Sequence, residues 1–135
     1  MNKPIPTFVH GIADYLGGVA LLLAPNLFGF ADLGGSAVWV PRVLGVVILV
    51  QSLATRYELG VVKLLPMRMH LMNDYVASLF LAASPWLFGF HDRPAHAWVP
   101  HLVVGLGVFV LTLLTQTEPR TTQSLTTPAM TPGAP

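Results

Sequence analysis

The chain has 135 residues, of which 53% are hydrophobic and only 10% are charged, with seven lysines and arginines against six acidic residues. Soluble domains carry about 25% charged residues, so this composition indicates an integral membrane protein. The balanced charge leaves no basic surface for nucleic acid, and a chain without cysteine cannot form disulfides, thiolate metal sites or Cys-x-x-Cys redox centres.

Four apolar runs follow one another along the chain, at about residues 7–24, 38–55, 67–84 and 98–114. Each run has about 18 residues, which gives a helix of roughly 27 Å, just enough to cross a hydrocarbon core of roughly 30 Å. The first run is not expected to be a cleaved secretory signal, because it lacks a small-x-small cleavage site and recurs later in the chain. The sequence therefore predicts an all-α membrane protein with four transmembrane helices.

A tandem duplication relates the two halves of the chain. Ala24-Pro25-Asn26-Leu27-Phe28-Gly29-Phe30 returns sixty residues later as Ser84-Pro85-Trp86-Leu87-Phe88-Gly89-Phe90. Such a repeat largely determines the architecture. Because each copy has two spans, both copies enter the membrane from the same side, and the predicted fold is a pair of tandem parallel helical hairpins.

The prolines of this duplicated stretch mark the ends of the first and third apolar runs. Pro25 and Pro85 each remove a backbone hydrogen bond and disfavour helix in the residue before them. We expect the helices either to stop there or to bend and continue towards Gly29 and Gly89.

The second copy also carries a family resemblance. Ser84-Pro85-Trp86, at the end of the first helix of a duplicated hairpin, resembles the motif of the SPW-repeat family of small bacterial and archaeal membrane proteins. The resemblance covers about residues 6–115, and the first copy keeps only Pro25 of the motif. It implies this fold and a prokaryotic cytoplasmic membrane. It implies no reaction, because the activity of the family is unassigned.

The distribution of basic residues predicts the orientation of the chain. Five of them lie on the side of the termini, namely Lys3, Arg56, Lys63, Arg68 and Arg120, and two on the other, Arg42 and Arg93. By the positive-inside rule, both termini are cytoplasmic. The predicted segments are a cytoplasmic N-terminus at 1–6, a first two-helix repeat at 7–55, a cytoplasmic connection at 56–66, a second two-helix repeat at 67–115, and a disordered Thr/Pro-rich tail at 116–135.

The central connection alternates charged and apolar residues. It is predicted either to lie on the membrane surface as an amphipathic segment or to extend the second helix before a loop.

Two matched polar pairs are the strongest candidate site. His10 and Asp14 recur as His70 and Asp74, and a spacing of four puts each pair on one helix face. Each aspartate lies about 10 Å into its span, where a carboxylate is costly and normally faces the interior of a bundle. The sequence predicts both pairs at the same depth, near the cytoplasmic side.

Four interpretations of these pairs are open. Two imidazoles and two carboxylates suit a divalent metal such as zinc, and the two histidines suit a haem between the first and third helices. The pairs also suit proton relay or cation transport. The fourth interpretation, which the sequence favours, is structural. Each aspartate then accepts hydrogen bonds from its own histidine or from Tyr15, Tyr75, Arg56 or Arg68 and fixes the helix positions.

A second group of histidines, His91, His96 and His101, falls in the outer loop and at the start of the fourth span. Their spacing of five is not that of a helix-borne zinc pair, and the first repeat has no copy of the group. We expect solvated histidines at the membrane interface.

With no catalytic constellation, the chain is expected to be a non-catalytic membrane scaffold or interaction protein rather than an enzyme, and no cofactor is assigned. The alternative is binding of metal or haem, or proton or cation translocation, through His10, Asp14, His70 and Asp74. Beside the lipid bilayer, the expected partner is a second copy or another membrane protein. Small residues predict close helix packing within the chain, with a homo-oligomer interface as the alternative; they include Gly17, Gly18, Gly45, Gly105 and Gly107.

Overall fold

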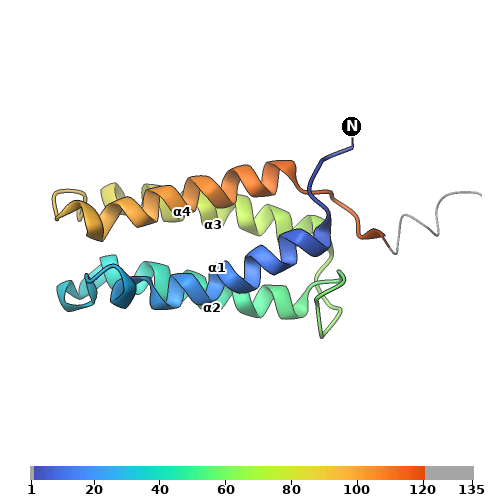
Figure 1. Ribbon diagram of the computed structural model, residues 1–135, viewed down its shortest axis with the longest axis horizontal. Coiled ribbons are helices and arrows are strands. Elements are labelled where there is room, and N and C mark those ends of the chain that lie inside the picture. The colour runs from blue at the N-terminus through green and yellow to red at the C-terminus, as the bar shows by residue number, and fades with distance from the viewer. Residues whose placement is uncertain (1, 121–135) are drawn as a thin grey trace, which may run out of the picture.

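A computed structural model describes residues 2–120 of the chain. It has four long helices, α1 (Thr7–Leu27), α2 (Gly35–Ala54), α3 (Met67–Leu87) and α4 (Ala95–Leu114), and a short 3-10 turn, η1 (Ala31–Leu33). The helices form an elongated bundle of two hairpins (Figure 1), so the predicted all-helical fold is confirmed. The sequence predicts a disordered tail from residue 116. Gln116 instead binds the backbone of Ile5 and Lys3, and the tail beyond residue 120 lies outside the described part.

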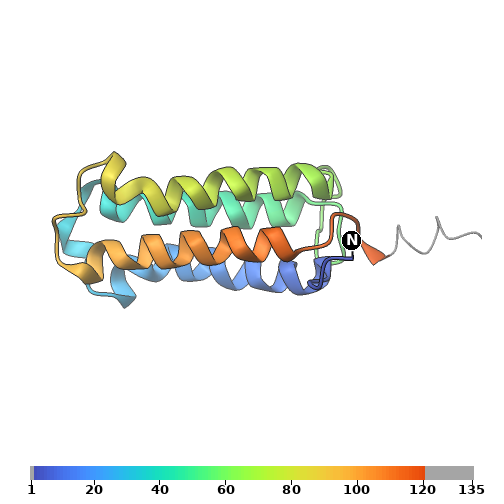
Figure 2. The ribbon, with the colours of Figure 1, turned by 90° about the horizontal axis from the view of Figure 1, so that it is seen from above.

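The bundle has two distinct ends. The N-terminus, the central connection and the end of α4 lie together at one of them, which we call the terminal end (Figures 1 and 2). The loops within the two hairpins lie at the other, which we call the hairpin end.

Three of the helices, α1, α2 and α4, are long and apolar enough to cross a membrane. Helix α3 is as long as α1, 21 residues, but carries Arg68, Asn73 and Asp74. It packs against α4 along the bundle (Figure 2), so the two form one hairpin. The outer faces expose large apolar side chains, among them Leu16, Val76 and Val103, as expected of a surface in contact with lipid.

Glycines bring the helices of each hairpin close together. A Cβ atom on Gly45 of α2 would lie 2.7 Å from the carbonyl oxygen of Gly18 in α1, and one on Gly105 of α4 would lie 2.6 Å from the backbone nitrogen of Ala82 in α3. Gly17, by contrast, faces open space. Gly18, Gly45 and Gly105 therefore serve packing within the chain, whereas Gly17 and Gly107 do not.

Helices α1 and α3 continue past their prolines. Pro25 and Pro85 lie in the last turn, and the helices end at Leu27 and Leu87. The prolines therefore do not end the helices, and each precedes a helix cap formed by the duplicated Leu-Phe-Gly-Phe.

The cap is the same in both repeats. Gly29 and Gly89 have positive φ angles of 73° and 69°, a conformation that glycine adopts without strain. The amide of the following phenylalanine, Phe30 or Phe90, donates to the carbonyl of the proline at 2.8 Å. This is the hydrogen bond of a Schellman motif, and it turns both phenylalanine rings into the bundle, where they are buried.

The serine of the Ser-Pro-Trp motif compensates for its proline. Pro85 has no amide hydrogen to donate to the carbonyl of Leu81, four residues earlier. The hydroxyl of Ser84 donates to that carbonyl at 2.7 Å. The first repeat has Ala24 at this position and lacks the replacement bond.

At the terminal end, each repeat begins beside the end of the other. Ile5 forms a parallel bridge with Thr115, and Leu65 forms one with Thr55. The two bridges are copies of one another, because the sixty-residue shift aligns their members. The connection 56–66 is a compact loop, so the predicted extension of the second helix is wrong.

Candidate metal centre

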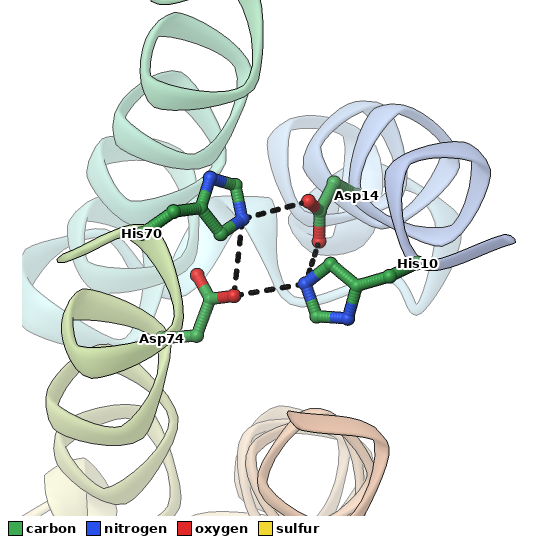
Figure 3. A group of neighbouring side chains, drawn as sticks. All are labelled: His10, Asp14, His70 and Asp74. Carbon is green, nitrogen blue, oxygen red and sulfur yellow. Dashed lines mark hydrogen bonds and ion pairs between the residues drawn. The ribbon is translucent and has the colours of Figure 1, made fainter. Parts of the chain in front are cut away.

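The duplicated histidines and aspartates meet inside the bundle, towards its terminal end. His10 and Asp14 come from α1, and His70 and Asp74 come from α3 (Figure 3). Helices α1 and α3 both pack on α2 and α4 rather than on each other, so they lie diagonally across the bundle. All four side chains are buried. The sequence predicted two pairs at equal depth, and the structure joins them in one cluster.

The shortest contacts in this cluster cross between the repeats. His10 Nε2 lies 3.0 Å from Asp74 Oδ2, and His70 Nε2 lies 2.9 Å from Asp14 Oδ2. The contacts within one helix, His10 with Asp14 and His70 with Asp74, measure 3.3 and 3.1 Å. Each Nε2 atom therefore faces both carboxylates, and the four groups alternate around a ring (Figure 3).

The tyrosines and arginines suggested as partners of the aspartates make other contacts. Tyr15 and Arg56 donate to backbone carbonyls of the central connection. Arg68 forms an exposed ion pair with Glu118, and the ring of Tyr75 packs against α4. Of the partners that the structural interpretation suggested, these four therefore do not contact the aspartates.

A threonine from the opposite repeat orients each imidazole. His10 Nδ1 lies 2.8 Å from the hydroxyl of Thr115, and His70 Nδ1 lies 2.7 Å from that of Thr55. Each hydroxyl donates its one hydrogen to the carbonyl four residues earlier in the chain, at 2.7 and 2.6 Å. The hydroxyl oxygen can then only accept, so Nδ1 carries the imidazole hydrogen and donates it.

This arrangement turns the Nε2 lone pairs inward. In a neutral imidazole with its hydrogen on Nδ1, Nε2 has only a lone pair to offer. Two such nitrogens converge on two buried carboxylates, whose oxygens lie 3.0 and 2.9 Å from them. Electron-pair donors that converge in a buried site require a positive charge between them. That charge is either one metal ion or protons held between the imidazole nitrogens and the carboxylates.

The cluster is slightly tighter than a zinc site, because its nitrogen-to-oxygen contacts measure 2.9 to 3.3 Å, and an ion would move the ligands apart by a few tenths of an ångström. Zinc in a tetrahedral site, with bonds of about 2.0–2.2 Å, holds its ligand atoms about 3.3–3.6 Å apart. The ligand atoms of the four residues lie within 4.8 Å of one another, and no other such group occurs between residues 2 and 120. A divalent ion would also neutralise both carboxylates, and this is favourable because unpaired charges are costly inside a membrane.

The spacing of the imidazoles does not suit haem. The ring centroids of His10 and His70 are 5.5 Å apart, with the ring planes at 72°. Carboxylate oxygens lie beside both Nε2 atoms, so a porphyrin between the rings would displace both aspartates. The geometry favours an ion over a macrocycle.

Side chains of α2 hold the two carboxylates in place. The amide of Gln51 donates to Asp74 Oδ1, which leaves Oδ2 facing the histidines. The hydroxyl of Ser52 donates to Asp14 Oδ2 at 3.3 Å. Hydrogen bonds of this outer kind orient metal ligands and raise metal affinity.

The central connection covers the cluster at the terminal end. The ring of Tyr57 lies 5.8 Å from that of His70, and the residue is 2% exposed. Burial raises the pKa of Tyr57, so its hydroxyl stays neutral above the carboxylates. A hydrogen bond of 2.7 Å from Thr7 to Glu58 ties the connection to α1. The cluster is thereby shielded from water by the chain itself.

Sequence analysis missed four of the side chains that support the cluster. For Thr55 and Thr115 a signal existed, because the sixty-residue shift aligns them at the ends of their repeats. For Gln51 there was none, since the same shift aligns it with Leu111, whereas Ser52 aligns with Thr112, which also carries a hydroxyl group.

The remaining predicted residues lie near the hairpin end, away from the cluster. The motif residues Ser84, Pro85, Trp86 and Pro25 form the helix ends described above, and Trp86 packs edge-to-face on Trp98 with ring centroids 5.7 Å apart.

The outer histidines differ from one another in exposure. His91 and His96 are exposed, as expected. The prediction of a solvated His101 is wrong, because this side chain is 1% exposed and lies between Phe30 and Phe90.

Comparison with known proteins gives one match. A family model described as the SPW repeat domain matches residues 8–115, a range that contains the whole cluster. Neither the curated proteins nor the solved structures gave a match.

Proposed function

The chain belongs to the SPW repeat family, and we propose that this small membrane protein binds one divalent metal ion of the zinc type between its two repeats. One observation carries the proposal: two imidazoles, with Nδ1 hydrogens bound to threonine hydroxyls, turn their Nε2 lone pairs towards two buried carboxylates. The donor set, two nitrogens and two carboxylates, is one that zinc accepts.

The proposed role of the metal is structural. Four protein side chains complete a tetrahedral zinc site and leave no position for a substrate, which is the pattern of structural rather than catalytic zinc. The ion would join α1 to α3, two helices that do not otherwise pack on each other. It would therefore lock the two hairpins together, and the chain would act as a non-catalytic membrane scaffold.

We further propose that the protein lies in the cytoplasmic membrane of a prokaryote with both termini inside. The excess of basic residues at the terminal end supports this orientation. The metal would then sit near the cytoplasmic side. A second copy or another membrane protein, in addition to lipid, remains the proposed partner of the exposed helix faces.

The test is metal analysis of protein purified in mild detergent with a tag that does not bind metal. We expect about one zinc ion per chain in the native protein. The Asp14→Asn/Asp74→Asn protein should lose the metal but keep its helix content by circular dichroism. His10→Gln should also lose it, whereas His96→Gln is the matched control, because this imidazole is exposed in the outer loop.

Two results would contradict the proposal. One is native protein that contains no metal and takes up none when titrated with zinc, which would leave protons as the only positive charges in the cluster. The other is equal metal content in the native protein and the double aspartate variant, which would place the ion elsewhere.

A further inference from the structure

The four ligands of the proposed metal centre are buried, so an ion can reach them only when part of the chain moves. Two turns beyond the aspartates, Leu21 and Leu81 form an apolar core with Val40 and Ile48, which is a costly path for a charged ion. A path between the helices would start in hydrocarbon, which is costly as well. The terminal end remains, where the central connection covers the cluster (Figure 1).

One aromatic ring of the central connection lies against both the cluster and α1. The ring centroids of Tyr57 and His70 are 5.8 Å apart. The Tyr57 ring also packs so closely on Gly11 of α1 that it leaves no room for a Cβ atom there. The sixty-residue shift aligns Gly11 with Leu71. It aligns Tyr57 with Thr117, so the second repeat has neither a glycine nor a ring at these positions.

Side-chain hydrogen bonds hold this part of the connection against α1. The hydroxyl of Thr7, in the first turn of α1, donates to Glu58 Oε2 at 2.7 Å. The hydroxyl of Tyr15, about two turns further along α1, donates to the backbone carbonyl of Leu59 at 2.9 Å. Glu58 also accepts a longer hydrogen bond, of 3.4 Å, from the amide of Arg120. The two hydroxyl groups of α1 therefore make the shorter contacts with the residues that follow Tyr57.

The later part of the connection is fixed to a different helix. The carbonyls of Leu53 and Ala54, in the last turn of α2, accept hydrogen bonds from backbone amides between residues 61 and 65. Segment 57–60 is thus held to α1 mainly by side chains, whereas the residues after it are held to α2 by backbone. The segment can move away from α1 without breaking the bonds to α2.

We infer, on the basis of the metal site proposed above, that segment 57–60 is a lid through which the ion enters and leaves. When the segment moves away from α1, it carries the Tyr57 ring off the cluster and opens the terminal end. The hydroxyls of Thr7 and Tyr15 close the lid in the empty and in the loaded protein alike. Their removal should therefore speed uptake and release of zinc by the same factor and leave the dissociation constant unchanged.

The test compares rates of zinc exchange in mild detergent. Release is followed by mixing zinc-loaded protein with excess chromophoric chelator, and uptake by mixing metal-free protein with zinc. Thr7→Val removes a hydrogen bond to a charged group and should speed both by about tenfold or more. Tyr15→Phe removes a bond to a neutral carbonyl and should speed both severalfold. Tyr75→Phe is the matched control, because Tyr75 is the repeat counterpart of Tyr15 but packs on α4, and it should exchange zinc at the native rate.

Three results would count against the lid. Native rates in the Thr7→Val/Tyr15→Phe protein would overturn it, because the ion would then use another route. Faster release with unchanged uptake would also overturn it, since the hydroxyls would then stabilise only the loaded state. Native protein that binds no zinc would refute the metal site itself, and the lid with it. The single variants provide the comparison even if the double variant fails to fold.

Discussion

The threonines that orient the imidazoles provide a sharp test, because they contact no metal. Replacing Thr55 and Thr115 by valine keeps the size of each side chain and removes the acceptor of Nδ1. The imidazole then favours the tautomer with hydrogen on Nε2, which binds an aspartate and occupies the position of the metal. Zinc affinity should therefore fall although all four ligands are still present.

The expected loss of zinc affinity follows from the role of these hydrogen bonds to the metal ligands. Removing one such bond typically lowers metal affinity by about 10–100-fold. Because the two threonines hold different histidines, their effects should multiply, to about 10²–10⁴-fold in the double variant. Thr112→Val is the matched control. Thr112 is buried in α4 and donates to a backbone carbonyl at 2.8 Å in the same way, but it holds no imidazole.

Zinc dissociation constants are measured in detergent by competition with a chromophoric chelator. We expect the native protein and Thr112→Val to bind zinc equally tightly. Each single variant should bind zinc more weakly, and Thr55→Val/Thr115→Val should bind it most weakly. If the double variant bound zinc within twofold of the native protein, the argument from tautomers would be refuted.

The remaining predictions concern stability. Zinc at a hundred times its dissociation constant should raise the unfolding free energy by about 2.7 kcal/mol, seen as a higher thermal midpoint that a chelator reverses; an unchanged midpoint would argue against a structural metal. Ser84→Ala leaves the Leu81 carbonyl without its donor and should lower the unfolding free energy by about 1–3 kcal/mol. Ala24→Ser supplies that donor to the first repeat and should not lower it. Equal effects of the two variants in denaturant unfolding would count against this role of the serine. Gly105→Ala places a methyl group 2.6 Å from the backbone of α3 and should lower the unfolding free energy by about 1–3 kcal/mol in the same assay. Gly107 faces open space, so Gly107→Ala should leave the unfolding free energy unchanged.

The sequence predicted that the polar pairs face inward, because this direction follows from local rules. The spacing of His10 and Asp14 places them on one helix face, and the cost of a carboxylate in lipid turns that face inward. Their pairing with His70 and Asp74 could not be predicted in this way. It depends on the diagonal packing of α1 and α3 and on the rotation of each helix, which residue spacing does not specify.

The burial of His101 illustrates a similar limit. Its position beside a loop suggested contact with water, but two helix caps fold Phe30 and Phe90 over it. The duplicated Leu-Phe-Gly-Phe predicted a shared local structure in both repeats. It did not reveal which residue of α4 the two rings would cover, because that contact joins segments far apart in the chain.

The most direct test of the metal centre is X-ray absorption at the zinc edge on the purified, zinc-loaded protein. The account predicts four nitrogen and oxygen neighbours at about 2.0–2.2 Å, with the scattering pattern of two imidazoles. The pattern of one imidazole should disappear in His10→Gln if that variant is loaded at excess zinc. A six-coordinate oxygen shell without imidazole scattering would contradict the central claim, because the ion would then lie outside the cluster of His10, Asp14, His70 and Asp74.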